Sequence, residues 1–291
     1  MAWRLAAIVS AGLLLAQTAD GLAQGNAERG KVIFALAGGC GCHTAEAGPV
    51  GAGGRELPTP FGTFYGTNIT PDQDTGIGGW SDEEIAAAIR RGELRNKEVE
   101  APVMPYALYS GMADGDVSDL IAYLRSLPPV RRVNKQPETW MPMPRLAYRV
   151  WRLLFAPRVD PVPEVPKAGV ERGRYLVDHV AICGDCHTPR NALGGFRASM
   201  YLAGTAVGPD ERPVPNITPD HATGIGGWDV ADVTQLLENG MKPDFDNVQG
   251  LMAEVIDGYG GGPGYAQAPK SDLRAMAVYL KTIRPIPHAV R

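Results

Sequence analysis

A thirteen-residue segment occurs twice in this chain of 291 residues. Residues 68–80 read NITPDQDTGIGGW and residues 216–228 read NITPDHATGIGGW, so eleven of the thirteen positions are identical. Internal repetition of this kind is typical of a duplicated structural unit. The chain is also long enough for two units of roughly 100 to 150 residues each. We therefore expect two similar domains.

A cluster of two cysteines and a histidine precedes each repeat. The second cluster, 183–187, reads CGDCH, and its histidine lies 29 residues before the second repeat. Two thiols separated by two residues, with a histidine directly after them, form the pattern of covalent haem c attachment. The thiols bond to the haem vinyl groups and the histidine binds the iron. The cluster therefore predicts a haem held by Cys183, Cys186 and His187.

The first cluster, 40–43, reads CGCH and lacks one of the two residues between the cysteines. Its histidine lies 25 residues before the first repeat, which is where a second haem site is expected. We predict a covalent haem here, with Cys40 and Cys42 as attachment residues and His43 as axial ligand. Cys42 has its usual place beside the histidine, whereas Cys40 is displaced by one residue. The alternative is a haem-free first half with a Cys40–Cys42 disulfide, although such close cysteines rarely meet disulfide geometry.

Two methionines lie at matching distances after the repeats. Met104 and Met252 each follow the final tryptophan of their repeat by 24 residues. A methionine opposite histidine is a common ligand pair in cytochromes, so we predict Met104 and Met252 as the second axial ligands. Packing is the alternative role of a methionine, and Met112 and Met241 are the competing candidates. His179 is expected to be a surface or packing residue.

The rest of the pattern is helical. A capping box at 81–84 begins an amphipathic helix, and Asp229 caps its counterpart after the second repeat. No run of alternating strands is evident, so the chain is predicted to be mainly α. Further helices are expected over 26–36, 118–127, 170–179 and 271–283.

The N-terminus has the order of a secretory signal. Arg4 precedes an apolar stretch over 5–16, and small and polar residues follow through Ala23. The stretch is shorter than the ~20 residues of a spanning helix, which favours cleavage over the alternative of a retained membrane anchor. We therefore predict an exported, periplasmic protein.

The repeats and the composition give the expected boundaries. The predicted segments are a signal peptide over 1–23, a first haem domain over 24–130, a Pro-rich linker over 131–168 and a second haem domain over 169–291. An apolar island that contains arginines occupies 146–159 of the linker. Three roles stay open for this island: packing the two domains together through Trp151, Leu154 and Phe155, docking a partner subunit, or contacting a membrane.

The chain resembles the multihaem cytochrome c subunits of bacterial periplasmic dehydrogenases of the alcohol, gluconate and sorbitol types. The matching segments are ERGRYLVDHVAICGDCHTPRN at 171–191, both NITPD segments, VMPY at 103–106 and LMAEV at 251–255. The resemblance implies two tandem class I cytochrome c-like domains with two covalent haem c groups. It also implies the ligand pairs His187 with Met252 and His43 with Met104.

Three features depart from that group. The first attachment cluster is shortened, and the chain has room for two haem domains where members often have three. Many members end in a membrane-binding helix, whereas here we expect only a short polar helix before the final residues, PIPHAVR. The two-domain arrangement also resembles the cytochromes that serve molybdenum hydroxylases.

The ligand set and the resemblance imply electron transfer without bond chemistry, because histidine and methionine occupy both axial positions of the iron. We expect electrons to pass from a periplasmic dehydrogenase to a quinol-linked or terminal oxidase of the respiratory chain; peripheral membrane association stays open. The alternative is a dihaem enzyme of the peroxidase or thiosulfate-oxidising type. A formal net charge of −4 argues against a nucleic-acid partner.

Overall fold

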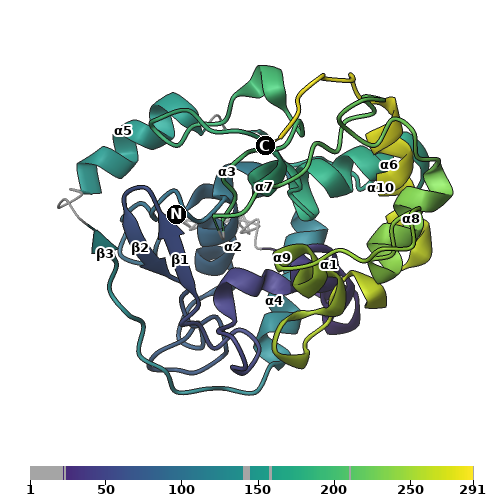
Figure 1. Ribbon diagram of the computed structural model, residues 1–291. Helices are drawn as coiled ribbons and strands as arrows, with labels where there is room; N and C mark the ends of the chain where they lie inside the picture. Colours follow the sequence, from purple (N-terminus) through teal and green to yellow (C-terminus); the bar gives the residue numbers. More distant parts are fainter. Residues whose placement is uncertain (1–21, 23, 140–144, 157–158, 210, 291) are drawn as a thin grey trace, which may run out of the picture.

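Two crossed helix pairs form the frame of the molecule in the computed structural model, which describes residues 22, 24–139, 145–156, 159–209 and 211–290. In the first half α1 (Ala27–Leu36) packs across α4 (Asp114–Ser126), and in the second half α6 (Gly169–Tyr175) packs across α10 (Lys270–Thr282). Figure 1 shows the two pairs in different parts of the molecule. The two halves of the chain therefore share one helical frame.

A glycine at each crossing lets the paired helices approach closely. A Cβ atom added to Gly30 would lie 1.8 Å from the carbonyl oxygen of Asp119. A Cβ atom added to Gly173 would lie 1.9 Å from the carbonyl oxygen of Ala275. Both distances are far below van der Waals contact, so the crossing as it stands accepts only glycine at these two positions.

The arginine before each of these glycines forms an ion pair with the facing helix. Nε of Arg29 lies 2.7 Å from Asp119, and Nη2 of Arg172 lies 2.8 Å from Asp272. Both partners of the second pair are largely buried, whereas Arg29 is mostly exposed. Salt therefore screens the second ion pair less than the first.

The capped helices predicted after the two repeats are confirmed. α2 (Asp82–Arg91) begins after Ser81, and α8 (Val230–Asn239) begins after Asp229. Both cap residues take part in a complete capping box, so two backbone N–H groups are satisfied at each helix start. The four other predicted helices are also present as α1, α4, α6 and α10, and α6 continues into a wider helical turn, η2 (Leu176–Val180).

Three short strands are present for which the sequence shows no pattern. β1 (Glu56–Thr59), β2 (Gly62–Tyr65) and β3 (Glu138–Thr139) form an antiparallel sheet in the order β1-β2-β3. They are too short for alternation to be visible. The fold is still mainly α. Because β3 lies in the predicted linker and pairs with β2, the start of that linker is attached to the first half.

The helix α5 (Arg145–Phe155) occupies the apolar island of the linker and contacts both halves. Its Trp151 Nε1 donates a hydrogen bond to the carbonyl of Leu193 in the second half, at 2.7 Å. Its Arg152 donates to the carbonyl of Arg91 in the first half, at 3.0 Å. The inner side of α5 thus packs on both halves, as predicted for Trp151, whereas Leu154, which was predicted to pack there too, is 63% exposed.

A short helix of each half packs at or just before the cysteine cluster of the other half. α9 (Leu251–Asp257) packs on η1 (Gly38–His43), which contains the first cysteine cluster. α3 (Tyr106–Tyr109) packs on η2, which precedes the second cluster in α7 (Gly184–His187). Three further single turns are η3 (Ala198–Met200), η4 (Tyr259–Gly261) and η5 (Tyr265–Gln267). The two clusters therefore lie on the surface where the halves meet.

Within the described residues, every helix is too short or too polar to cross a membrane. Nearly all of the predicted signal peptide, 1–23, lies outside the described residues. The division into domains over 24–130 and 169–291 stays a prediction.

Candidate functional site

The two candidate axial histidines are held in the same way. Nδ1 of His43 lies 2.8 Å from the carbonyl oxygen of Thr67, and Nδ1 of His187 lies 2.8 Å from that of Pro215. A carbonyl oxygen can only accept, so Nδ1 carries the proton in both rings and Nε2 is left as the free lone pair. Each carbonyl belongs to the residue just before a repeat. The repeats therefore orient both imidazoles.

The backbone of each histidine is fixed by an equivalent contact. The carbonyl of His43 accepts a hydrogen bond from the N–H of Gly53, and that of His187 accepts one from Gly204, both at 2.7 Å. Both glycines have a left-handed backbone, with φ of 75° and 80°, which glycine adopts without steric cost. The side chain and the main chain of the two histidines are thus held alike.

A buried asparagine anchors each repeat next to its histidine. Nδ2 of Asn68 donates to the carbonyl of Val130 at 2.7 Å, and Nδ2 of Asn216 donates to the carbonyl of Ile286 at 2.8 Å. Both asparagines are 3% exposed. Each amide therefore ties its repeat to the segment that follows the last helix of its half, which fixes the carbonyl that the imidazole contacts.

The surroundings keep both imidazoles neutral. Burial lowers the pKa of His43 and the pKa of His187, and the hydrogen bond to the carbonyl opposes this only in part. A neutral imidazole whose second nitrogen is oriented by a hydrogen bond is the usual state of a histidine metal ligand.

The two attachment segments differ in their backbone. In the second half, only Ile182 has a left-handed backbone (φ 44°) before the helical turn α7, which contains Cys186 and has Cys183 as its N-cap. In the first half, three consecutive residues, Gly38, Gly39 and Cys40, have φ of 66°, 63° and 45°. Counted back from the histidine, Gly39 occupies the place of Cys183. The missing residue is thus accommodated by left-handed backbone, strained at Cys40, which is not glycine.

The four cysteines are all unpaired thiols. The structure therefore contains no Cys40–Cys42 disulfide, contrary to the alternative for the first cluster. Burial is the main cause that raises the pKa of Cys40 and of Cys183 to about 12, and it raises the pKa of Cys186 as well, whereas Cys42 is exposed. The thiols are neutral at physiological pH, so the site does not favour thiolate chemistry.

The candidate methionines and their competitors have different surroundings. Met104 is half-buried just before α3, and Met252 is half-buried in α9. Met112 is fully buried in the hydrophobic core. The sulfur of Met241 accepts a hydrogen bond from the Gln235 amide at 3.0 Å. Both competitors are therefore engaged elsewhere.

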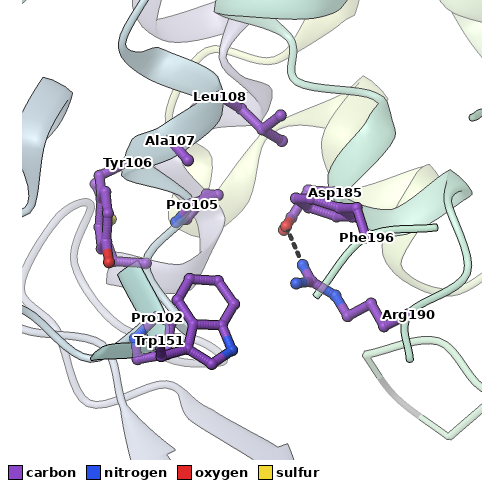
Figure 2. A pocket seen from close by; sticks show the side chains of 10 residues that line it. Pro102, Pro105, Tyr106, Ala107, Leu108, Trp151, Asp185, Arg190 and Phe196 are labelled. Carbon is purple, nitrogen blue, oxygen red and sulfur yellow. Dashed lines mark hydrogen bonds and ion pairs between the residues drawn. The ribbon is translucent and has the colours of Figure 1, made fainter. Parts of the chain in front are cut away.

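A small pocket brings the first methionine segment together with the second attachment segment. Met104 lines it with Trp151 of α5 and with Asp185 from α7, one of the two residues between Cys183 and Cys186. Figure 2 shows the ion pair of Asp185 with Arg190 facing the Pro102–Leu108 segment across this pocket. Burial raises the pKa of Asp185, and Arg190 opposes the shift. In the sequence, Asp185 is only a spacer between the cysteines. Its burial could not be predicted, because it depends on how the other half packs against it.

Two tyrosines interact with the cysteine clusters: Tyr109 is half-buried and Tyr265 is buried. Burial raises the pKa of Tyr109 well above its usual value, and the next causes are cysteines of both attachment segments together with Asp185. Tyr265 shows the same pattern: burial comes first, followed by a cysteine of the second segment and Tyr109. Tyr109 therefore interacts with cysteines of both clusters, and Tyr265 with those of the second. Nothing in the local sequence marks them, since their position follows from how the halves pack.

One further contact tests whether a haem suits the first site. The hydroxyl of Tyr106, two residues after Met104, is buried and lacks a hydrogen-bond partner among the described residues. A buried hydroxyl without an acceptor is destabilising. A haem has two propionate carboxylates, which are acceptors of the kind that this hydroxyl lacks. Together with the neutral imidazoles and thiols, the residues present fit a bound haem c.

His179 is a packing residue, as predicted. Its Nδ1 contacts the carbonyl of Leu108 at 3.0 Å, and its ring lies against Gly111, so it links η2 to the first half.

Comparison with known proteins gives an independent result. The family model for cytochrome c matches residues 27–128. A "Diheme cytochrome c-type" protein of Cereibacter sphaeroides is 39% identical over 274 residues, which is 90% of this chain and 87% of that protein.

Two further relatives are subunits of larger enzymes. The cytochrome c subunit of the alcohol dehydrogenase (quinone) of Gluconobacter oxydans is 35% identical over 98% of this chain. The gluconate 2-dehydrogenase cytochrome c subunit of Pantoea cypripedii is 34% identical over 95% of this chain. The chain spans 61% and 64% of the length of these two subunits.

Proposed function

The chain belongs to the cytochrome c family, and we propose that it is a periplasmic dihaem cytochrome that carries electrons from a partner dehydrogenase toward the respiratory chain. The observation that carries the proposal is the matched holding of His43 and His187. Each donates Nδ1–H to the carbonyl before a repeat and leaves a neutral Nε2 for iron. Two equivalent imidazoles support two haems.

Haem c, when bound, supplies a one-electron redox centre. Cys183 and Cys186 would hold it in the second half by two thioethers. Cys42 would hold it in the first half, and Cys40 is the candidate for a second bond there. Neutral thiols in apolar surroundings suit this role, because the thioethers that replace them are also uncharged and need no solvation.

Met104 and Met252 are the proposed distal ligands. A thioether sulfur opposite an imidazole raises the potential of a haem iron. If Met104 and Met252 bind the irons together with His43 and His187, no position is left there for a substrate. The engagement of Met112 in the core and of Met241 with Gln235 supports this assignment. The chain then transfers electrons, and the dehydrogenase does the bond chemistry.

The two sites would exchange electrons inside the protein. The half-buried Tyr109 interacts with cysteines of both attachment segments, and the buried Tyr265 interacts with those of the second. Asp185 of the second segment shares a pocket with Met104 of the first half. These contacts support a short separation between the haems, so that an electron accepted at one site reaches the other without leaving the protein.

A dehydrogenase is the proposed donor because two of the relatives are cytochrome subunits of an alcohol and a gluconate dehydrogenase. We place the protein in the periplasm, exported through residues 1–23, and propose a quinol-linked or terminal oxidase as the acceptor. A transient contact of small area is typical of such electron-transfer partners.

The test is purification of the haem-loaded protein from the membranes and periplasm of its source, followed by identification of what co-elutes. We expect a dehydrogenase whose substrate reduces both haems in the co-purified complex. A protein that elutes alone and is reduced by no dehydrogenase of its source would show that the proposed function is wrong.

A further inference from the structure

Exposed apolar side chains gather on one segment of the protein. Ten large apolar side chains are exposed in the described part of the chain, and six of them lie within 131–159, on and beside α5. The six are Val133, Leu146, Val150, Leu153, Leu154 and Val159. Figure 1 shows α5 at the edge of the molecule, apart from the crossed helix pairs.

Four of these side chains form one stripe along α5. Leu146, Val150, Leu153 and Leu154 have the spacing i, i+4, i+7 and i+8, which places them on one face of a helix. Leu153 is 85% exposed, and the other three are at least 49% exposed. The aromatic Trp151 lies on the opposite side, where it bonds to the second half. The stripe therefore faces away from the protein.

The same segment is strongly basic in an acidic protein. Residues 131–159 contain seven Arg or Lys residues and one Glu, a net charge of +6, whereas the whole chain has −4. The rest of the chain therefore has −10. Arg149 of α5 is exposed and forms no ion pair with any described residue. The aliphatic stripe thus lies in a segment whose net charge is opposite to that of the rest of the chain.

We propose that the outward face of α5 docks on the surface of a membrane that contains anionic lipids. A helix with one apolar face and flanking basic residues is typical of binding in the lipid interface. Each basic residue near an anionic surface adds to the attraction. This goes beyond electron transfer itself and would hold regardless of which dehydrogenase is the donor.

The composition of the face favours lipid over a protein partner. Energetically dominant residues of protein interfaces are enriched in Trp and Tyr, whereas Leu and Val are under-represented. On α5 the outward residues are Leu and Val, and Trp151 packs inward. The inner side of α5 also lines the pocket that contains Met104. Docking would therefore bring this pocket, and with it Met104 of the first half, close to the membrane.

The test is sedimentation of the exported, haem-loaded protein with lipid vesicles. We expect binding to phosphatidylcholine vesicles that contain phosphatidylglycerol, weaker binding at high salt, and none to pure phosphatidylcholine. L153D should lower binding at least tenfold, and R149E about tenfold. F245D is the matched control, since Phe245 is also 85% exposed but lies far along the chain from α5. All variants share the same N-terminus, and unchanged haem spectra report intact folding.

Three results would overturn the proposal: no binding by the unaltered protein, equal binding to the neutral vesicles, or equal loss in F245D. A fourth is an L153D protein that binds vesicles normally but is no longer reduced by the donor dehydrogenase, because the face would then dock a protein. Failure of any of these kinds leaves the electron-transfer function standing, since reduction by the dehydrogenase is measured without vesicles.

Discussion

The two attachment segments differ where the haem would be covalently bound and agree where its iron would be ligated. His43 and His187 contact backbone carbonyls at the same distance, and a glycine N–H holds each histidine backbone at the same distance. The segments before them differ, with three left-handed residues in the first half and one in the second. The position of the imidazole is thus kept while the spacing of the cysteines changes.

This difference indicates which contacts each site depends on. The repeat, its asparagine and its carbonyl are all required to orient an imidazole, and all occur twice. In the proposed first site, Cys40 would only add a second tether to a haem already held by Cys42. A cluster that has lost one residue can therefore still be a haem site, provided that the repeat beside it is intact.

The largest expected effect separates the two cysteines of the first cluster. C42A should remove the covalent haem from the first half, because Cys42 is next to His43 as Cys186 is next to His187. C40A should keep that haem, because one thioether suffices to retain it. Haem staining after denaturing electrophoresis measures the covalently bound haem that each variant retains. Loss of staining in C40A equal to that in C42A would mean that both thiols are needed.

The next effect tests the common frame of the halves. G30A and G173A each place a methyl group within 2 Å of a backbone carbonyl of the facing helix, so both crossings must open. We expect each change to cost about 3 kcal/mol of unfolding free energy, the upper range for overpacking. Urea unfolding of the haem-loaded proteins gives the values. A cost in one variant and none in the other would show that the frames are not equivalent.

A smaller and equal effect is expected at the anchors of the repeats. N68A and N216A each remove a buried amide and leave a carbonyl, that of Val130 or of Ile286, without its donor. The loss should be about 2 kcal/mol in each case. Substitution of the exposed Asn96 by Ala serves as a control. If N68A alone were tolerated, the first repeat would not hold its histidine as the second does.

The smallest effect concerns acid. Hydrogen bonds from Thr75 and Thr223 lower the pKa of Asp72 and of Asp220, respectively, below the ordinary value of 3.8. A carboxyl with a lowered folded-state pKa stabilises the protein while ionised, and this contribution is lost as the pH falls below 3.8 through the folded-state pKa. D72N and D220N should each remove the same small part of the loss of stability at low pH. The midpoint of urea unfolding, measured across an acidic pH series, reports this loss. If only one variant changed the dependence of stability on pH, the two turns would not be equivalent.

The sequence predicted the features that depend on neighbouring residues. The repeat predicted the equivalence of the two histidines, and the capping boxes predicted where α2 and α8 begin. It did not predict features that depend on distant pairing. β3 pairs with a strand more than seventy residues earlier, and the burial of Asp185 and Tyr109 depends on how the halves meet. The ligand roles of Met104 and Met252 stay predictions based on matched spacing.

The mass of the intact exported protein tests the central claim most directly. If both halves hold a covalent haem, the mass exceeds that of the polypeptide by two haem groups. A mass increased by a single haem, with Cys40 and Cys42 both titrating as free thiols after denaturation, would contradict it.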